Sequence, residues 1–276
     1  MNTTIERPDS DEDYAFIQQI VYKLSRISLG PQKKQMVVSR IAKRMRTLGY
    51  TSIREYCELL KKPSGRAELS TLIDVISTNH TYFFRESSHF DYLTREILHK
   101  GRGARKGVFR VWSAACSSGE EPYSVAMILA EQSRVERGFD WTMEATDISS
   151  IVLAKAQAGV YTEAALSRVP EVLRRRYLEP QTTGETHRVV PLLKKKIRFS
   201  RLNLFEIPES FPDKFDLIIC RNVMIYFDRS TREELVEMMV ERIVPGGTLY
   251  VGHSESLGGL RHRLKMVRPA IYLKTV

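Results

Sequence analysis

The sequence predicts a doubly wound α/β domain with a mainly parallel sheet, preceded by a small all-helical domain. The first hundred residues carry apolar side chains at helical spacing, whereas after Gly107 short apolar strands alternate with helices. Strands separated by helices are typical of a parallel sheet whose faces are both covered. With 276 residues, 42% hydrophobic and 28% charged, the chain is long enough for two cores, and its composition excludes disordered, fibrous and membrane-embedded proteins.

Three helices are predicted in the N-terminal region, at residues 31–48, 52–60 and 67–77. The core-facing side of the first helix is formed by residues at spacings of three and four: Val38, Ile41, Met45 and Leu48. Gly49 follows as the C′ residue that ends this helix. Ser52 and Glu55 have the spacing of a capping box, which predicts the start of the second helix.

The excess of basic charge is concentrated in this region. Between Tyr14 and Arg66 there are 12 Lys and Arg residues against 2 acidic residues, and the remainder has 31 of each, because the whole chain has 43 basic and 33 acidic residues. Such a localised excess indicates a docking surface for an acidic partner, and the alternative is an ordinary solvated helix face. The basic residues of helix 31–48 that would form the surface are Lys33, Arg40, Lys43, Arg44 and Arg46.

The second part of the chain follows a linker rich in glycine and basic residues at 100–107. Strands are predicted at 109–115, 142–145, 215–220, 249–252 and 270–274, and helices at 122–135, 149–158 and 231–243. Pro245, Gly246 and Gly247 predict a turn after the last of these helices. Between residues 176 and 199 the helical signal lapses, and the β-prone Val189 and Val190 predict a small hairpin there.

The residues that follow the predicted strands indicate a ligand site, because ligands of open parallel sheets bind beyond the carboxyl ends of the strands. Residues 114–122 are mostly small and lack both the glycine pattern and the Lys-Ser/Thr pair of phosphate-binding loops. Asp147 ends the second strand, where an acid accepts hydrogen bonds from ribose, and a helix N-cap is its alternative role. Asn222 and Tyr226 follow the strand at 215–220. These strand ends favour an adenosine-type ligand without a phosphate cradle, which points to S-adenosylmethionine.

Disulfides and metal sites are not expected. Cys57, Cys116 and Cys220 are widely spaced and form no Cys-x-x-Cys pair, which favours a reduced cytosol. A secretory signal would begin with basic residues followed by an apolar run, whereas residues 1–13 are acidic. No apolar run approaches the roughly 18 residues of a membrane-spanning helix, so we expect a cytoplasmic protein.

Six motifs resemble those of the chemotaxis-receptor glutamate methyltransferases, the CheR family, and the resemblance is collinear from about Tyr14 to the C-terminus. The motifs are TNHTYFFRE at 78–86, SAACSSGEEPYS at 113–124, ATDI at 145–148, LNL at 202–204, CRNVMIYF at 220–227 and GHSE at 252–255. The resemblance implies a Rossmann-like class I S-adenosylmethionine-dependent methyltransferase domain with a small β-subdomain insertion. The implied boundaries are 1–78 for the helical domain with its basic docking face, 79–107 for a linker and cofactor-contacting segment, and 108–276 for the methyltransferase domain, with the β-subdomain at about 179–199.

The resemblance also implies the roles of particular residues toward S-adenosylmethionine. It assigns Asn79, Thr81 and Arg85 to the methionine portion, with Arg85 paired to the carboxylate. It assigns the amino and ribose groups to Glu121 and Asp147. The adenine and the reaction centre would be lined by Asn203, Leu204, Asn222 and Val223. Local structural roles, such as turn, cap and ion-pair residues, are the alternative for each.

The implied reaction is methyl transfer to glutamate side-chain carboxylates on the cytoplasmic helices of chemoreceptors, which gives glutamate methyl esters and S-adenosylhomocysteine. A glutamate with a pKa of about 4.3 is already ionised at neutral pH, so no general base is required, and the enzyme must desolvate and align its reactants. Tyr226 is the candidate that orients the incoming carboxylate. The basic helix would dock on the acidic receptor helices, with the enzyme a monomer that works at membrane-bound receptor arrays without entering the membrane.

Two other functions remain open from the sequence alone. An RNA methyltransferase would use the same cofactor and a basic helical region, but this region lacks a recognition-helix pattern rich in base-reading side chains, so no nucleic acid is expected. A non-catalytic S-adenosylmethionine-binding regulator is the second alternative, and only an assay distinguishes it from an enzyme.

Overall fold

A computed structural model describes residues 11–98, 107–182 and 184–275. The chain divides into two compact units. The helical unit contains Met1–Thr78 together with Tyr226–Thr231, and the sheet unit contains Asn79–Ile225 together with Arg232–Val276. The predicted linker at 100–107 and the acidic terminus at 1–13 lie mostly outside the described residues.

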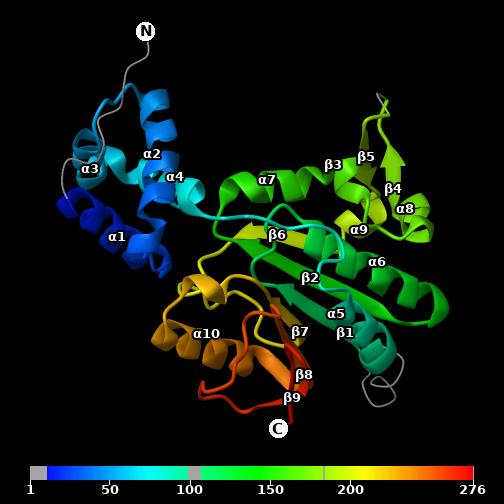
Figure 1. The fold of residues 1–276 in the computed structure, drawn as a ribbon. Coiled ribbons are helices and arrows are strands. Elements are labelled where there is room, and N and C mark those ends of the chain that lie inside the picture. Colours follow the sequence, from blue (N-terminus) through cyan, green and yellow to red (C-terminus); the bar gives the residue numbers. More distant parts are fainter. Residues whose placement is uncertain (1–10, 99–106, 183, 276) are drawn as a thin grey trace. The chain divides into compact units, whose positions relative to one another are not determined.

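The described part of the helical unit contains four α-helices, of which the first was not predicted (Figure 1). They are α1 at Asp11–Ser25, α2 at Lys34–Leu48, α3 at Ile53–Lys61 and α4 at Arg66–Ile76. The side of α2 that faces the core differs by one residue from the prediction. Val37, Ile41 and Met45 are each 0% exposed, whereas Val38 is only half-buried and Leu48 is 36% exposed. A strict spacing of four residues therefore replaces the predicted mixture of three and four.

The predicted helix ends of this unit are confirmed. Gly49 has a left-handed φ of +78° at the end of α2, which a residue with a Cβ rarely adopts. Ser52 and Glu55 form the complete capping box of α3. The backbone N–H of Glu55 donates to Ser52 Oγ at 3.2 Å, and the N–H of Ser52 donates to the Glu55 carboxylate at 3.2 Å.

The sheet unit contains a seven-stranded sheet in the order β6-β2-β1-β7-β8-β10-β9. Its strands are β1 at Val108–Ser113, β2 at Asp140–Asp147, β6 at Ile197–Arg201, β7 at Phe215–Cys220, β8 at Ile243–Val251, β9 at Leu264–Arg268 and β10 at Ile271–Lys274. The pairs from β6 to β8 are parallel, and β10 runs antiparallel to both of its neighbours. Because the strand order reverses between β1 and β7, this sheet has a topological switch point there, where ligands of doubly wound folds bind.

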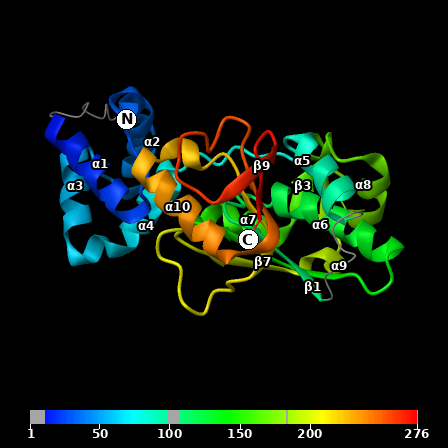
Figure 2. The same cartoon turned by 90° about the horizontal axis from the view of Figure 1, so that it is seen from below.

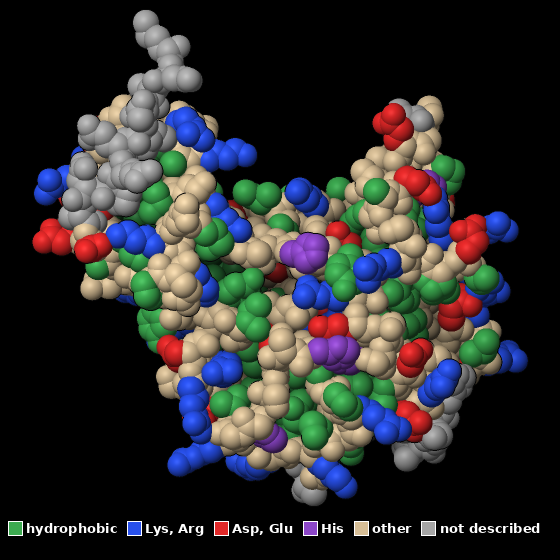
Figure 3. Space-filling model, viewed as in Figure 1, with side chains coloured by type: hydrophobic (Ala, Val, Ile, Leu, Met, Phe, Trp, Pro, Cys, Tyr) green, Lys and Arg blue, Asp and Glu red, His purple; other side chains and the backbone are tan. Residues whose placement is uncertain are grey.

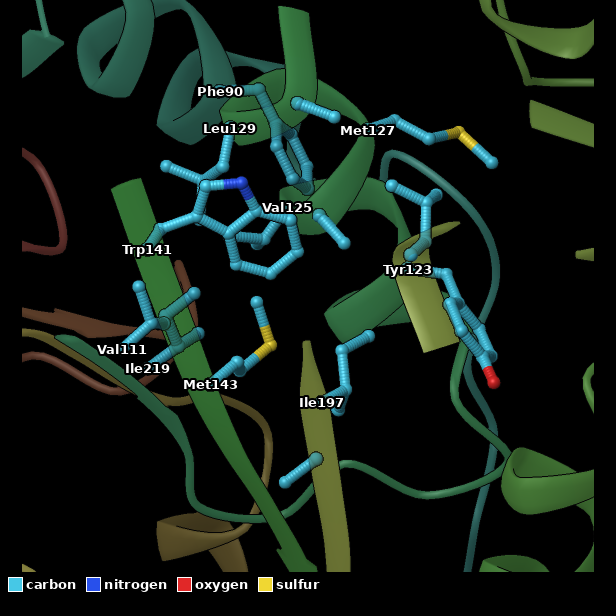
Figure 4. Close-up of a cluster of buried hydrophobic side chains, with 14 of the residues drawn as sticks. Phe90, Val111, Tyr123, Val125, Met127, Leu129, Trp141, Met143, Ile197 and Ile219 are labelled. Atoms are coloured by element: carbon cyan, nitrogen blue, oxygen red, sulfur yellow. The ribbon is translucent and has the colours of Figure 1, made fainter. Parts of the chain in front are cut away.

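Helices cover both faces of this sheet. In Figure 1, α6 at Glu120–Val135 and α7 at Ser150–Ala158 lie on one side of the central strands, and α10 at Arg229–Arg242 lies on the other. Figure 4 shows how the core under α6 is filled, with side chains of α6 facing Trp141 and Met143 of β2. Val125, Leu129 and both of these residues are at most 3% exposed. Complete burial of such side chains stabilises the fold by about 1.5–3 kcal/mol each.

A second, three-stranded antiparallel sheet corrects the predicted hairpin at 176–199. Its order is β3-β5-β4, with β3 at Val160–Thr162, β4 at Leu178–Pro180 and β5 at Thr186–Val189. The hairpin itself is formed by β4 and β5, but β3 was not predicted, and the last predicted residues belong to β6 of the large sheet because Ile197 pairs with Met143. The short helices α8 at Glu171–Tyr177 and α9 at Pro191–Lys194 flank these strands, at the same end of the sheet unit as β3 (Figure 2).

The predicted turn at Pro245, Gly246 and Gly247 is also corrected, because these residues lie inside β8. The register between β7 and β8 shifts between Phe215 and Leu217, and Gly246 has a φ of +74°. A local irregularity of the strand therefore accommodates the Pro-Gly-Gly sequence without ending it. The α5 helix at Ser87–Tyr92 continues into a π-helical turn at Leu93–Leu98.

None of the helices in the described residues combines the length and the apolar character that a bilayer-spanning helix needs.

Candidate cofactor site

The candidate site is formed where β1, β2 and β7 end. The register pairs Ser113 of β1 with Ala145 of β2 and with Ile219 of β7, so the carboxyl ends of these three strands meet at one edge. Four of the nine predicted cofactor residues lie at or after these strand ends, namely Glu121, Asp147, Asn222 and Val223. All nine of the predicted cofactor-binding residues belong to the sheet unit.

Asp147 holds the loop after β1 in place. The backbone N–H of Ser117 donates to Asp147 Oδ2 at 2.8 Å, and the N–H of Ser149 donates to Asp147 Oδ1 at 2.9 Å. Ser117 has a left-handed φ of 48°, an unusual conformation for serine that this contact supports. Asp147 therefore links the loop after β1 to the start of α7 through backbone N–H groups. Ser149, rather than Asp147, caps α7 through its side chain.

Gly119 is required where this loop enters α6. Its φ is +98°, and a Cβ at this position would lie 2.6 Å from Tyr161 Oη and 2.9 Å from Ala156 Cβ. The Tyr161 hydroxyl donates to the carbonyl of Ser118 at 2.7 Å, which fixes the same turn. The small residues of the loop therefore let it pack closely against Tyr161 and Ala156.

Glu121 and Arg221 form a buried ion pair that joins the ends of β1 and β7. Arg221 Nε donates to Glu121 Oε2 at 2.8 Å, and Ser113 Oγ donates to Glu121 Oε1 at 2.7 Å. Arg221 also donates through Nη1 to the carbonyl of Arg85 at 2.5 Å. Glu121 and Arg221 are each 7% exposed, so both charges depend on this network for compensation.

The segment from Asn79 to Glu86 approaches the site through unusual backbone conformations. Phe84 and Glu86 have φ values of 54° and 59°, both left-handed. The carbonyl of Asn79 accepts a hydrogen bond from Ser117 Oγ at 3.1 Å, which brings this segment to the loop after β1. Arg85 donates to the carbonyl of His80 at 2.8 Å and is half-buried, as is Thr81. Strained conformations of this kind gather at functional sites.

Glu255 organises the loop after β7, and no role was predicted for it. Its carboxylate accepts hydrogen bonds from the backbone N–H groups of Asn222 at 2.6 Å, Gly252 at 2.7 Å and Ile225 at 3.2 Å. Asn222 has a left-handed φ of 61° at this point. Glu255 is 4% exposed; burial raises its pKa, and the backbone N–H groups offset part of that rise. Its sequence motif was recognised, but its partners lie up to 33 residues away in the chain.

The remaining predicted residues of the sheet unit are also near strand ends. Asn203 and Leu204 follow β6, where Asn203 Oδ1 accepts from the backbone N–H of Phe205 at 3.2 Å and Leu204 is 8% exposed. The backbone N–H of Leu202 donates to the carbonyl of Asp147, which ties this turn to the end of β2. Val223 is half-buried in the loop that Glu255 holds.

His89 is a neutral side chain that contacts Arg221. It is 1% exposed, and its Nδ1 lies 3.3 Å from Arg221 Nη1. Burial, and then the charge of Arg221, lower its pKa to about 3. Glu86, His89 and His253 lie close enough together to suggest metal ligands. However, the Arg221 guanidinium already lies against two of them, at 3.6 Å from Glu86 Oε2, and it supplies the cation there.

The residues predicted for substrate docking and catalysis belong to the helical unit. Two of the five basic residues bind α4 and the residue that follows it. Arg40 donates to the carbonyls of Ile76 and Ser77 at 2.6 and 3.0 Å, and Arg44 forms a two-pronged ion pair with Glu68 at 2.9 and 2.7 Å. These guanidinium groups fasten α2 to α4.

The other three basic residues are placed differently. Lys43 and Arg46 are exposed, whereas Lys33 is half-buried. Lys33 Nζ donates to the carbonyl of Ser28 at 3.0 Å and lies 5.2 Å from the centre of the Tyr226 ring. The carbonyl of Tyr226 accepts from the backbone N–H of Ser28 at 2.8 Å.

These features define a Rossmann-like S-adenosylmethionine-dependent methyltransferase. They are the parallel sheet with antiparallel final strands, the loop of small residues after β1, and the acids at the switch point. Residues 79–273 match the family described as CheR methyltransferase, SAM binding domain, and residues 12–77 match the CheR methyltransferase all-alpha domain. The chain therefore belongs to the CheR methyltransferase family, as the sequence motifs indicated.

Curated relatives agree with this family over nearly their whole length. The chemotaxis protein methyltransferase of Borreliella burgdorferi is 42% identical over 261 residues, which cover 93% of this chain and 92% of the relative. The Escherichia coli protein of the same name is 38% identical over 265 residues, covering 95% and 91%. The Listeria monocytogenes protein is 32% identical over 269 residues, covering 97% and 99%.

Proposed function

We propose that this enzyme methylates glutamate side-chain carboxylates of chemoreceptors, and that it works in the cytoplasm at membrane-bound receptor arrays. The products would be glutamate methyl esters and S-adenosylhomocysteine. The proposal is supported by the family and by the relatives named chemotaxis protein methyltransferase. The experiment that tests it is methyl transfer from tritiated S-adenosylmethionine to receptor-containing membranes, scored as base-labile label.

The observation that carries the choice of a carboxylate is that the buried titratable groups of the site are already engaged. Glu121 is paired with Arg221, Glu255 accepts backbone N–H groups, and burial beside Arg221 leaves His89 a very weak base with a pKa of about 3. An amine or hydroxyl substrate would have to lose a proton to a nearby base. A glutamate carboxylate is ionised at neutral pH and requires none.

The residues at the strand ends fit the cofactor that the family uses. When bound, S-adenosylmethionine supplies the methyl group. Asp147 would accept a hydrogen bond from the ribose, and Asn203, Leu204, Asn222 and Val223 would line the adenine and the reaction centre. Asn79, Thr81 and Arg85 would hold the methionine portion. Glu121 would attract its amino group, although its carboxylate oxygens already accept from Ser113 and Arg221.

Tyr226 is the proposed residue for orienting the incoming carboxylate. It comes directly after Ile225, whose backbone N–H is bound by Glu255. Replacement by phenylalanine removes the hydroxyl and keeps the ring. We expect Tyr226→Phe to lower kcat while the dissociation constant for S-adenosylmethionine stays unchanged, since the hydroxyl would act on the acceptor alone. Steady-state kinetics and calorimetry measure the two quantities. An unchanged kcat would remove Tyr226 from the mechanism.

The docking surface is proposed to be the exposed part of the basic α2 helix, above all Lys43 and Arg46. Figure 3 shows several Lys and Arg side chains over this part of the helical unit. We expect Lys43→Glu with Arg46→Glu to raise the KM for receptor-containing membranes about ten-fold at low salt and less at high salt, because exposed charge pairs are screened. The melting temperature should not change.

The matched control for this prediction makes the same change of charge through Arg54→Glu in α3 with Lys62→Glu just after it, and both residues are exposed. Equal effects of the two double variants would show that only the net charge matters and would contradict docking through α2. Reversal of Arg40 or Arg44 is unsuitable for this test, since it would break the contacts between α2 and α4.

A further inference from the structure

Arg168 is a cation of the sheet unit that the proposed mechanism does not use. It lies between β3 and α8 and is exposed. Its neighbours Arg174, Arg175 and Arg176 are each paired with a glutamate. Arg168 has no carboxylate partner among the described residues. Its charge is therefore available to an acid from outside the described part of the chain.

The Arg168 side chain is nevertheless held in a defined place. Its guanidinium carbon lies 4.2 Å from the centre of the Tyr82 ring, well within the range of a cation–π interaction. Arg85 approaches the same ring at 5.7 Å. Two cations from separate segments thus meet at one aromatic ring, and the arrangement is most stable with anions bound beside them. In the proposed function Arg85 holds the carboxylate of the cofactor, which leaves Arg168 for another anion.

An open pocket of about 640 Å³ lies beside Arg168, lined by Phe84, Glu86, Ser87, Ser88, Arg168 and His253. Its volume exceeds that of a single side chain. Ser87 and Ser88 are exposed, and Ser88 Oγ lies 3.2 Å from His253 Nε2, so hydroxyl and imidazole groups line the pocket together with the guanidinium. These groups suit a polar, acidic occupant.

Glu86 is the single acid of this lining, and its carboxylate is largely buried. Its side chain is only 12% exposed. Oε1 accepts from the backbone N–H of His253 at 3.3 Å, and Oε2 lies 3.6 Å from Arg221 Nη1. The same carboxylate lies 3.5 Å from Asn222 Nδ2 in the loop after β7, which places the pocket beside the candidate cofactor site.

We propose that Arg168, supported by Tyr82, binds an acidic side chain of the substrate helix that neighbours the glutamate to be methylated. The inference rests on the proposed function and names a determinant of substrate specificity for it. A guanidinium paired directly with the reacting carboxylate would stabilise its negative charge and lower its nucleophilicity. Arg168 therefore binds a second carboxylate, that of a neighbouring acidic residue, so that the enzyme favours glutamates in acidic surroundings.

The test compares Arg168→Ala, Arg168→Lys and Arg168→Glu in the full chain, with receptor-containing membranes as the substrate. Arg168→Ala is expected to raise the KM for the membranes roughly five- to ten-fold with kcat retained, because the contact binds ground state and transition state alike. Arg168→Lys keeps the charge but not the planar fork and should show a smaller rise, and Arg168→Glu a larger one. The dissociation constant for S-adenosylhomocysteine and the melting temperature should not move.

Arg175→Ala is the matched control, because this α8 arginine has 80% of its side chain exposed and is paired only with Glu171 one turn away. An unchanged KM for Arg168→Ala, a fall in kcat in place of a rise in KM, or an equal effect of Arg175→Ala overturns the inference. Failure of the proposed function is recognised separately, since the wild-type enzyme would then leave no base-labile label on the membranes.

Discussion

Arg221→Met is expected to lower the free energy of unfolding by about 3–5 kcal/mol, because it leaves the Glu121 carboxylate buried without its counter-ion. Glu121 is 7% exposed, and Arg221 Nε is its charged partner at 2.8 Å. The same substitution removes the hydrogen bond to the carbonyl of Arg85 and the contact with His89 Nδ1. Chemical denaturation measures the loss, and the affinity for S-adenosylhomocysteine should fall with it, since the ends of β1 and β7 would no longer be joined.

The double variant Glu121→Met with Arg221→Met shows whether the unpaired Glu121 charge causes the loss of stability in Arg221→Met. Removal of both charges should restore most of the lost stability, because no uncompensated charge remains. Arg134→Met is the control, since this arginine forms an exposed ion pair with Glu131 and should change stability by less than about 1 kcal/mol. A double variant as unstable as the single one would contradict the assignment.

Glu255→Ala is expected to cost about 2–4 kcal/mol of stability and to weaken cofactor binding more than ten-fold. It leaves the N–H groups of Asn222, Gly252 and Ile225 without an acceptor, and each unsatisfied buried donor costs about 1–3 kcal/mol. Part of that loss is offset, because the ionised carboxylate no longer has to be buried. The loop after β7 would lose its fixed conformation, including the left-handed Asn222.

Glu255→Gln distinguishes the effect of side-chain volume from the effect of hydrogen-bond acceptance by Glu255. Glutamine has nearly the same volume but offers one acceptor oxygen and an amide that donates, so it satisfies only part of the carboxylate's role. We expect an intermediate loss of stability and a clear loss of affinity for S-adenosylhomocysteine by calorimetry. The exposed Glu237 of α10 provides the control, as Glu237→Gln. Wild-type affinity in both Glu255 variants would show that this loop does not form the cofactor site.

The sequence predicted the fold of this chain well because its helices and strands have clear periodicity and end signals. The Ser52 capping box and the Gly49 helix end are local signals, and both are present in the structure. Asp147 was predicted from its place at a strand end, and its backbone contacts now show how it shapes the neighbouring loop. Local patterns therefore indicated where the site lies.

The features that were missed depend on contacts between distant residues. Arg221 meets Glu121 across 100 residues of the chain, and no local pattern reveals that pair. The basic residues of α2 have the same appearance in the sequence, yet Arg40 and Arg44 are used to fasten α4 while Lys43 and Arg46 are exposed. Which of several arginines serves the fold and which faces a partner is decided by tertiary packing.

Methylation of glutamate carboxylates is tested most directly by the base-lability of the transferred methyl group. The enzyme is incubated with tritiated S-adenosylmethionine and receptor-containing membranes, and the labelled receptor is treated with mild base. We expect volatile tritiated methanol from the receptor band, because methyl esters of glutamate hydrolyse in base. Label that stays on protein or RNA after this treatment, or no label despite cofactor binding, would contradict a glutamate O-methyltransferase and favour another substrate or a regulator.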